Sequence, residues 1–273
     1  GVLETKGDME VRIDALITDS REKTSGGLFF CISGARFDAH TFVGQAEKNG
    51  CVAFVVERIL DADVTREKVE NVRSAMAYIA AAFYGHPEKE IRMVGVCGTK
   101  GKTTTSYLMK AILEKAGFQT GLIGTTGNMI GEKRLHSNLT TPDPIDLHRC
   151  LRQMRDEGVE VVSMEVSAHA VAMHRLDGVT FEAACYTNLS QDHLDYFHTM
   201  DHYLETKRKF FHSGMVRNAT FNADEETTPR MTEALDIPYM TYGICAEADL
   251  YARDIEITEN GVSFEMKLAG MHN

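Results

Sequence analysis

A glycine-rich stretch with two lysines, residues 98–104, carries the residue types of a phosphate-binding loop. Glycine lets the backbone curl so that its N–H groups point at phosphate oxygens, and a helix that follows adds partial positive charge. Lys102 adds a full charge, and the Thr103 hydroxyl is suited to hold Mg²⁺. The general pattern has glycine at position 96, where this chain has Val96, so a tight turn with a chance Gly-Lys-Thr is the alternative. If the stretch is a phosphate loop, its nucleotide contacts would be Gly98, Thr99, Lys100, Gly101, Lys102, Thr103 and Thr104.

Two further candidate ligands come where apolar, strand-like runs end. Glu165 ends the run 159–166, and His193 follows the run 183–189. Ligands of an open parallel sheet bind beyond the carboxyl ends of its strands, so both side chains would face the phosphates. Mg²⁺ prefers oxygen ligands and retains several waters, which suits Glu165 better than His193. A surface carboxylate at Glu165 and a hydrogen-bonded loop histidine at His193 are the alternatives.

Lys207 falls on the apolar side of a predicted helix over residues 199–212. One interpretation is a lysine whose stem covers the core while its amine reaches water. The other is a desolvated amine with a lowered pKa. A neutral amine reacts with CO₂ to form a carbamate, which would turn a cation into an anionic oxygen ligand for a metal.

The elements that would position these residues follow from the hydrophobic pattern. Short apolar runs predict strands over 92–97, 119–123, 159–166 and 183–189, with helices between them, the first over 102–116. Strand–helix alternation of this kind predicts a doubly wound, mostly parallel sheet. Alternating apolar residues on both sides of Asn260-Gly261 predict a β-hairpin near the end of the chain.

A smaller α/β unit is expected before this sheet. Strands are predicted over 28–32 and 51–56, and apolar residues at helical spacing predict a helix over 71–84. Gly85-His86-Pro87 would end that helix, because glycine suits the C-terminal cap and proline does not continue a helix. The fold class is therefore α/β, with domains over residues 1–86 and 87–273.

Composition narrows the functional classes. The chain has 273 residues, 43% of them hydrophobic, and a formal net charge of -11. An acidic balance argues against a nucleic-acid partner, which needs a dense basic face. The longest apolar run, residues 75–84, is too short to span a bilayer, and no export signal opens the chain. Six scattered cysteines without a paired motif favour reduced thiols in a cytoplasmic protein without a membrane partner.

Taken together, these pieces resemble the Mur ligase family over essentially the whole chain. Glycines at 95, 98 and 101 followed by Lys-Thr-Thr are similar to the family's ATP loop and account for the shifted glycine. Segments 140–144, 164–169 with Arg175, and 187–196 resemble members that add the third residue of the bacterial cell-wall stem peptide. Segments 18–21, 27–34 and 37–42 are also similar to members that add the terminal dipeptide, so they discriminate less.

The resemblance implies a role for each matching position. Glu165, His193 and Thr103 would hold Mg²⁺, and Lys207 would join them as a carbamate. The uridine end of a UDP-sugar peptide would be met by Ser20, Ala35, Arg36 and Phe37. Its sugar-peptide portion would be held by Thr140, Thr141, Ser167 and Arg175, the last through a bidentate pair with a carboxylate.

The implied activity is ATP-dependent amide ligation. Members of this kind join UDP-MurNAc-L-Ala-D-Glu to meso-diaminopimelate or L-lysine through an acyl phosphate, with ATP and Mg²⁺. The family's third domain, which would receive the diamino acid, is not in this sequence, so we expect a chain that binds ligands without completing the reaction. We also expect a monomer. Two alternatives stay open, a non-catalytic fragment that binds nucleotide and UDP-sugar, and an unrelated P-loop ATPase or kinase.

Overall fold

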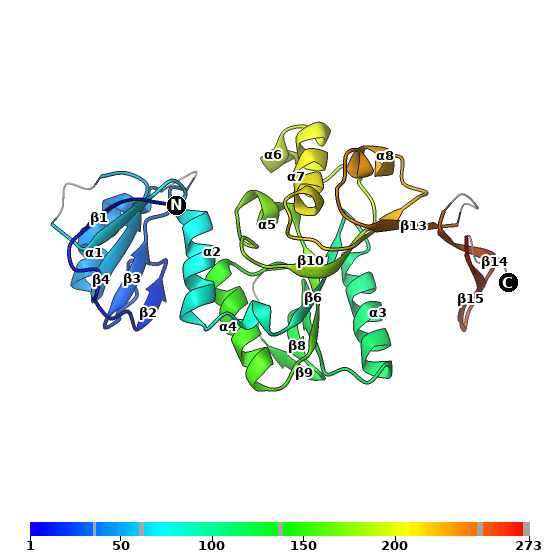
Figure 1. Ribbon diagram of the computed structural model, residues 1–273, viewed down its shortest axis with the longest axis horizontal. Coiled ribbons are helices and arrows are strands. Elements are labelled where there is room, and N and C mark those ends of the chain that lie inside the picture. Colours follow the sequence, from blue (N-terminus) through cyan, green and yellow to red (C-terminus); the bar gives the residue numbers. More distant parts are fainter. Residues whose placement is uncertain (35–36, 60–62, 136–138, 245–247, 270–273) are drawn as a thin grey trace.

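The computed structural model describes residues 1–269 apart from 35–36, 60–62, 136–138 and 245–247. In the described part of the chain, the strands form two sheets, one within residues 2–69 and one within residues 92–268 (Figure 1). The predictions made for Ala35 and Arg36 fall outside the described residues. The predicted α/β class, with a small first unit and a larger parallel sheet, is confirmed.

The first sheet has five strands in the order β1-β5-β4-β3-β2. Strands β2 to β5 pair in parallel, and β1 pairs with β5 in the antiparallel sense. Successive side chains of a strand point to opposite faces. Phe29 packs in one buried cluster with Val43, whereas Phe30 packs in a second cluster with Val72 and Met76. Helices therefore cover both faces. The elements are β1 (Val2–Lys6), β2 (Ala15–Ile17), β3 (Gly27–Phe30), η1 (Ala39–Phe42), α1 (Val43–Lys48), β4 (Cys51–Val56) and β5 (Arg66–Val69).

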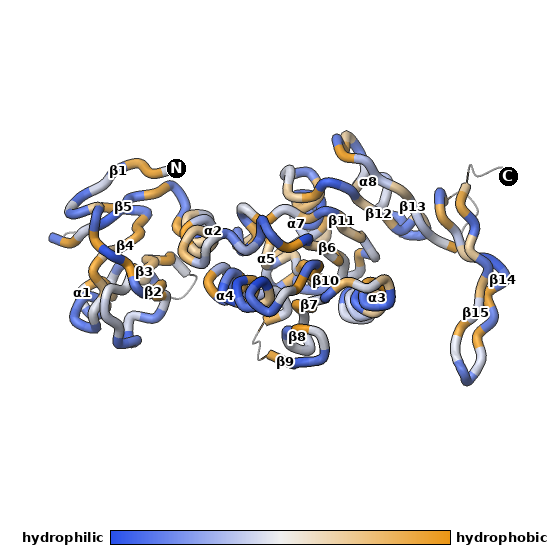
Figure 2. Tube along the Cα trace, turned by 60° about the horizontal axis from the view of Figure 1, so that its bottom comes forward, coloured by the Kyte–Doolittle hydropathy of each residue, from blue (hydrophilic) through white to orange (hydrophobic). Residues whose placement is uncertain are grey.

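Helix α2 (Val72–Phe83) joins the two sheets. It begins as predicted after Asn71, whose side chain accepts a hydrogen bond from the Ser74 N–H at 3.1 Å. Its apolar side packs on the first sheet, and Ile145 of α4 (Pro144–Asp156) completes the same cluster. Figure 2 shows α2 mostly in white and orange beside α4, as expected for a helix covered by neighbours on more than one side.

The second sheet has ten strands in the order β15-β14-β13-β12-β11-β6-β10-β7-β8-β9. The seven strands from β14 to β7 in this order pair in parallel, and β8, β9 and β15 are antiparallel additions. The strands are β6 (Arg92–Cys97), β7 (Thr120–Ile123), β8 (Asn128–Ile130), β9 (Lys133–Leu135), β10 (Val161–Val166), β11 (Phe181–Tyr186), β12 (Ala219–Asn222), β13 (Tyr239–Gly243), β14 (Leu250–Thr258) and β15 (Gly261–Leu268). The remaining helices are η2 (Pro87–Lys89), α3 (Lys102–Lys115), α5 (Ala168–Ala172), α6 (Leu194–Phe197), α7 (Met200–His212) and α8 (Thr228–Thr232).

Strand β10 shows the burial on both faces that is typical of a strand in the middle of a parallel sheet. All of its residues are buried, because β6 and β7 flank it and helices cover both faces. By contrast, the predicted hairpin β14–β15, which is confirmed, reaches away from the body of the protein (Figure 1). Its turn lies at Glu259-Asn260, one residue before the predicted Asn260-Gly261, because Gly261 already pairs with Thr258. Its apolar side chains Ile257, Phe264 and Met266 are exposed.

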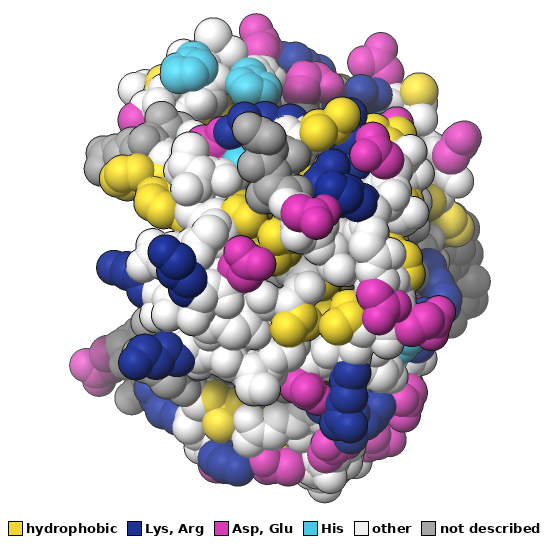
Figure 3. Space-filling view, turned by 90° about the vertical axis from the view of Figure 1, so that its left-hand side faces the viewer, with side chains coloured by type: hydrophobic (Ala, Val, Ile, Leu, Met, Phe, Trp, Pro, Cys, Tyr) yellow, Lys and Arg dark blue, Asp and Glu magenta, His cyan; other side chains and the backbone are white. Residues whose placement is uncertain are grey.

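On the face seen in Figure 3, acidic and basic side chains are interspersed, so this face carries charges of both signs. In the described ranges, no helix is long and apolar enough to cross a bilayer. The five cysteines that the structure describes are buried and free, and Cys245 lies outside the described residues.

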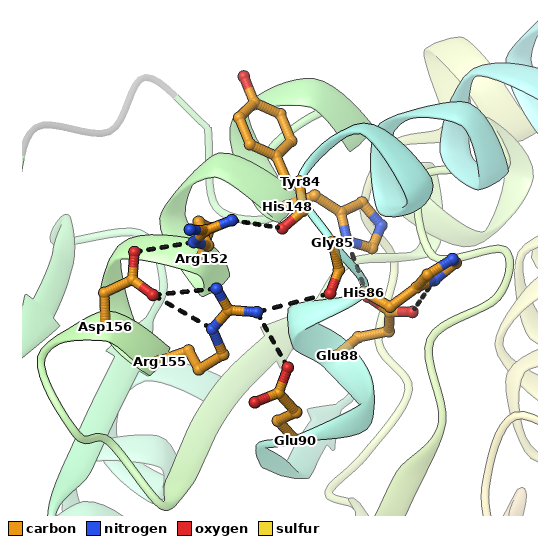
Figure 4. A network of polar contacts seen from close by, with 9 residues as sticks. All are labelled: Tyr84, Gly85, His86, Glu88, Glu90, His148, Arg152, Arg155 and Asp156. Carbon is orange, nitrogen blue, oxygen red and sulfur yellow. Dashed lines mark hydrogen bonds and ion pairs between the residues drawn. The ribbon is translucent and has the colours of Figure 1, made fainter.

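A polar network closes the junction between α2 and α4 (Figure 4). Arg152 and Arg155 of α4 donate to the carbonyl oxygens of Tyr84 and Gly85, where α2 ends. Beneath them, His148 is 0% exposed, and its Nδ1 lies 3.4 Å from Glu88 Oε2. Neither ring nitrogen of His148 has a hydrogen-bond partner within the described part of the chain.

This environment makes His148 a source of acid sensitivity. Burial lowers the pKa of His148 from about 6.5 to about 4, although the Glu88 carboxylate opposes the shift and His86 adds to it. The unfolded chain therefore binds more protons than the folded chain between these values. The stability that a neutral His148 allows is present above pH 6.5 and is lost as the pH falls toward 4.

We predict that His148→Gln flattens this acid limb of the stability curve. The wild-type chain should lose about 3 kcal/mol more than the variant between pH 7 and pH 4, as a shift of this size implies. Urea unfolding at a series of pH values measures the difference. His198→Asn is the matched control, because asparagine tolerates the φ of 63° at this exposed position and leaves His148 and its neighbours His86 and Glu88 in place. Parallel curves for wild type and His148→Gln would contradict the prediction.

Candidate functional site

The phosphate-loop sequence lies between β6 and α3, at the carboxyl edge of the second sheet. Its backbone is bound to the end of β11, because the Thr99 N–H donates to Asn188 O at 2.9 Å and Thr187 Oγ1 donates to Lys100 O at 2.8 Å. Gly98 is required by this contact, since a Cβ there would lie 1.9 Å from Thr187 Oγ1. The interpretation as a chance glycine turn does not account for this arrangement of strand, loop and helix.

Lys102 opens α3 and turns back over the loop. Its Nζ donates to Gly98 O and Thr99 O, both at 2.9 Å. Burial lowers the pKa of Lys102, and the nearby Lys207 lowers it further. Lys100 instead is exposed and lies 3.8 Å from Asp192, and Thr104 faces outward in the first turn of α3.

Glu165 lies at the end of β10, opposite Val96 of β6. It is 1% exposed, so the alternative of a surface carboxylate is wrong. Its oxygens accept hydrogen bonds from Thr103 Oγ1 at 3.0 Å, from Thr125 N at 2.9 Å and from Thr125 Oγ1 at 3.1 Å. A buried carboxylate beside a threonine hydroxyl of the phosphate loop is an oxygen donor set that fits Mg²⁺.

Lys207 on α7 is fully buried, at 0% exposure, so the interpretation in which its amine reaches water is wrong. Its Nζ has no hydrogen-bond partner among the residues that the structure describes, and it lies 4.3 Å from the centre of the Tyr203 ring. Burial lowers the pKa of Lys207, against the opposing influence of Cys97 and Asp192. An ammonium without partners is costly in the interior, so the neutral amine is favoured.

His193 follows β11 at the N-terminus of α6, with a left-handed φ of 55°. Its side chain is half exposed, and its Nδ1 lies 3.7 Å from Asp192 Oδ1. The ring meets His169 edge to face at 4.7 Å, and Tyr203 at 6.2 Å. Tyr203 therefore touches both His193 and Lys207, which places the two predicted ligands on the same side of the sheet edge.

The residues predicted for the sugar-peptide portion gather around Glu165. Thr141 is 1% exposed, donates to Glu165 O at 2.8 Å and accepts from the Ser167 N–H at 3.0 Å. Arg175 Nη1 donates to Thr141 O at 2.8 Å, and Thr140 Oγ1 lies 3.0 Å from Thr125 Oγ1. The Thr141 hydroxyl thus ties the loop before α4 to the end of β10, whereas Thr140 and Arg175 lie further toward the surface.

Ser20 and Phe37 lie together in the first unit. Both are far from the phosphate loop in sequence. Both line a cavity of about 490 Å³. Ser20 Oγ donates to Gln45 Oε1 at 3.3 Å, and Phe37 is 72% exposed. The other lining residues are Thr18, Asp19, Arg21, Phe29, Ile32, Gly34, Ala39, Phe42 and Gln45.

Three residues of this site were missed by the sequence reasoning. Thr125 and Tyr203 contact the predicted ligands Glu165 and Lys207, and His169 contacts His193. Thr125 carried a usable signal, because it follows β7 just as Glu165 ends β10, and strand ends of a parallel sheet meet at one edge. Within the described ranges, no three His, Cys, Asp or Glu side chains form a metal cluster. Mg²⁺, which takes few protein ligands beside phosphates and water, does not require one.

The chain is similar to ligases of known activity. The family model of the Mur ligase middle domain matches residues 96–273. A UDP-N-acetylmuramoyl-L-alanyl-D-glutamate--2,6-diaminopimelate ligase from Geobacillus thermodenitrificans is 41% identical over 261 residues, which are 93% of this chain and 53% of the relative. A ligase of the same name from Listeria monocytogenes is 39% identical over 264 residues, 94% of this chain and 54% of the relative. The chain therefore spans about half the length of the curated relatives it matches.

Solved structures agree with this similarity. The structure of a UDP-N-acetylmuramoyl-L-alanyl-D-glutamate--2,6-diaminopimelate ligase aligns with a TM-score of 0.82 at 26% identity, over 93% of this chain and 53% of that one. MurF ligase from Thermotoga maritima in complex with ADP aligns with a TM-score of 0.59 at 22% identity, over 96% of this chain and 57% of that one, a likeness of fold alone. Because the middle-domain model covers well over half of its residues, this chain belongs to the Mur ligase family.

Proposed function

We propose that this chain is the nucleotide-binding and UDP-sugar-binding part of an ATP-dependent ligase that adds the third residue of the stem peptide. Residues 1–86 would form the uridine-binding domain and residues 87–273 the ATP-binding domain. The acceptor would be UDP-MurNAc-L-Ala-D-Glu, and the added residue a diamino acid, meso-diaminopimelate or L-lysine. The first of these agrees with the names of the relatives.

One observation carries the proposal. The Glu165 residue is bonded through its side chain to Thr103 of the phosphate loop and through its carbonyl oxygen to Thr141, which also contacts Ser167 and Arg175. A phosphoryl donor on the loop and an acceptor carboxylate near Arg175 would therefore meet at Glu165. Membership of the family removes the alternative of an unrelated P-loop kinase or ATPase. The alternative of a fragment that binds nucleotide and UDP-sugar without catalysis needs the same binding residues, so it shares the binding predictions.

Each residue has a chemical task in this reaction. Arg175 would pair with an acceptor carboxylate, because a guanidinium makes two parallel hydrogen bonds to it. That carboxylate attacks the γ-phosphorus of ATP, a new O–P bond forms, and ADP leaves. Lys102 would move from Gly98 O and Thr99 O to the phosphates and stabilise the charge on the transferred group. The amine of the diamino acid then displaces phosphate from the acyl phosphate, loses a proton and forms the amide.

Mg²⁺, when bound, would neutralise charge on the phosphates. Glu165 and Thr103 are suited to bind it as oxygen ligands. The half-exposed ring of His193 lies on the same edge of the sheet. Lys207 fits the remaining role only as a carbamate. Its neutral Nζ would attack CO₂, form an N–C bond and release one proton, which places an anion where the structure has an unpartnered amine.

We predict that Lys102→Ala weakens the binding of ATP with Mg²⁺ at least tenfold in this chain. The variant loses the buried cation of the loop, and a charge-assisted hydrogen bond contributes about 1.5–3 kcal/mol. Isothermal titration calorimetry measures the affinity. Lys115→Ala is the matched control, since that exposed lysine lies in the last turn of α3, at the opposite end of the helix from the loop, and should change affinity little. Equal losses in the two variants would contradict the assignment of Lys102.

We predict that Lys207 forms a carbamate in bicarbonate buffer. Carbon-13 NMR with labelled bicarbonate should show a carbamate resonance that Lys207→Arg abolishes. Lys110→Arg is the matched control, because Lys110 is also buried but forms an ion pair with Glu114 at 2.6 Å. A resonance that persists in Lys207→Arg, or its absence from the wild-type chain, would refute the prediction.

We predict that the chain binds UDP-MurNAc-L-Ala-D-Glu more tightly than UDP-GlcNAc, and that Arg175→Gln removes most of this preference. The dipeptide compound carries the carboxylates that a guanidinium recognises, so the variant should lose on the order of tenfold in affinity. Titration calorimetry with both compounds is the measurement, and the exposed Arg149→Gln on α4 is the control. If the wild-type chain binds both compounds equally, the substrate assignment fails while the nucleotide assignment stands.

A further inference from the structure

We propose that Thr125 is a positioning residue, which holds the Glu165 carboxylate in the orientation that Mg²⁺ requires and sets the polarity of Thr140 toward the substrate. The inference rests on the proposed function, because it takes Glu165 as the magnesium ligand. Thr125 lies in the loop after β7, and the sequence separates it from Glu165 by 40 residues.

Thr125 binds both oxygens of the carboxylate. Its backbone N–H donates to Oε1 at 2.9 Å, and its hydroxyl lies 3.1 Å from Oε2. Thr103 Oγ1 donates to Oε2 at 3.0 Å. A carboxylate held at both oxygens does not rotate about its last bond, so the lone pair that these three bonds leave free, on Oε1, keeps one direction. The close approach of the two strands depends on Gly124, where a Cβ would lie 2.3 Å from Glu165 Oε1.

The direction of the protons follows from the count of donors. Thr125 Oγ1 donates its single hydroxyl proton to Glu165 Oε2. In the 3.0 Å contact between Thr125 Oγ1 and Thr140 Oγ1, the Thr125 oxygen must then accept and Thr140 must donate. The Thr140 proton is used in this bond. Toward a ligand, Thr140 is an acceptor, which suits an amide N–H or a sugar hydroxyl and leaves carboxylate recognition to Arg175.

The same count applies to Thr103. Its proton is given to Glu165, so its oxygen lone pairs remain for a cation. Thr103 and Thr125 thus approach one carboxylate oxygen from two different loops, and only Thr103 belongs to the phosphate loop. Removing the Thr125 hydroxyl should disturb the metal contribution to nucleotide binding and leave the metal-free contribution unchanged.

The test is the gain in affinity that Mg²⁺ gives to a non-hydrolysable ATP analogue. Isothermal titration calorimetry of this chain, with Mg²⁺ and with a chelator, measures both affinities for each variant. Thr125→Val should reduce the magnesium gain about tenfold, as the loss of one hydrogen bond to a charged group implies, without changing the metal-free affinity. Thr125→Ser should restore the gain, because it keeps the hydroxyl.

Two control variants separate the proposed chain of hydrogen bonds from a general effect on the loop. Thr126→Val removes the neighbouring hydroxyl, which bonds Tyr107 at 2.8 Å instead of Glu165, and should leave the gain unchanged. Thr140→Val should also keep most of the gain, because Thr140 donates to Thr125 and does not touch the carboxylate. A clearly higher gain in Thr140→Val would overturn the assigned direction of the protons, because it would mean that Thr125 gives its proton to Thr140 in the wild-type chain and to Glu165 only in the variant.

The remaining outcomes decide between the proposal and a purely structural role. A wild-type magnesium gain in Thr125→Val, or equal losses with and without metal, would overturn the proposal. No magnesium gain in the wild-type chain would instead show that the proposed metal role of Glu165 is itself wrong, and the inference about Thr125 would fall with it.

Discussion

The site depends on the parallel pairing of β6 with β10 on one side and with β11 on the other. Glu165 and Val166 of β10 lie opposite Val96 and Cys97 of β6, and Tyr186 of β11 also lies opposite Cys97. Parallel strands end at the same edge, so this register brings the phosphate loop, Glu165 and the loop after β11 together. A shift of one residue would turn Glu165 to the other face of the sheet.

Charge at this edge is concentrated and poorly solvated. Burial lowers the pKa of both Lys102 and Lys207, and Lys207 adds to the shift of Lys102. Glu165 is the buried carboxylate nearby, and hydrogen bonds from two threonines satisfy it. Groups desolvated in this way gain most from a ligand of opposite charge, because the interaction is screened little. A polyanion such as a triphosphate, with a divalent cation, supplies both signs.

The first sheet is attached to this centre through packing and polar contacts of different kinds. Ile145 of α4 lies in the same cluster as Phe30 and Val72, so one apolar core spans the junction. Ser74 of α2 donates to Asp177 at 2.6 Å, beyond α5. The network around Arg155 and His148 closes the other end of the contact (Figure 4). In the proposed function, a cavity for the distal end of a long substrate would have to keep its position relative to the reacting end, and these contacts would provide that support.

Local sequence determined the elements and the positions of the main candidates. The bounds of β4 and β6 agree with the prediction, and those of α2, α3 and α7 agree within one residue. In α2 and α7 the apolar spacing reports burial directly. In α3, whose buried residues are Ser106 and Lys110, the flanking glycines at 101 and 117 set the ends instead. The loop motif and the placement of Lys207 on an apolar face were likewise visible in the chain. The short strands β1, β2, β5, β8, β9, β12 and β13 were missed, since three to five residues carry too little periodicity.

Only the tertiary structure decided what each polar group touches. That Thr125 holds Glu165, that the Thr141 hydroxyl is used inside the protein, and that Lys207 has no partner among the described residues all depend on chain segments far apart in sequence. Periodicity shows which side of an element is buried. It does not show which hydrogen-bond donor meets which acceptor, because sheet register and loop geometry set that choice.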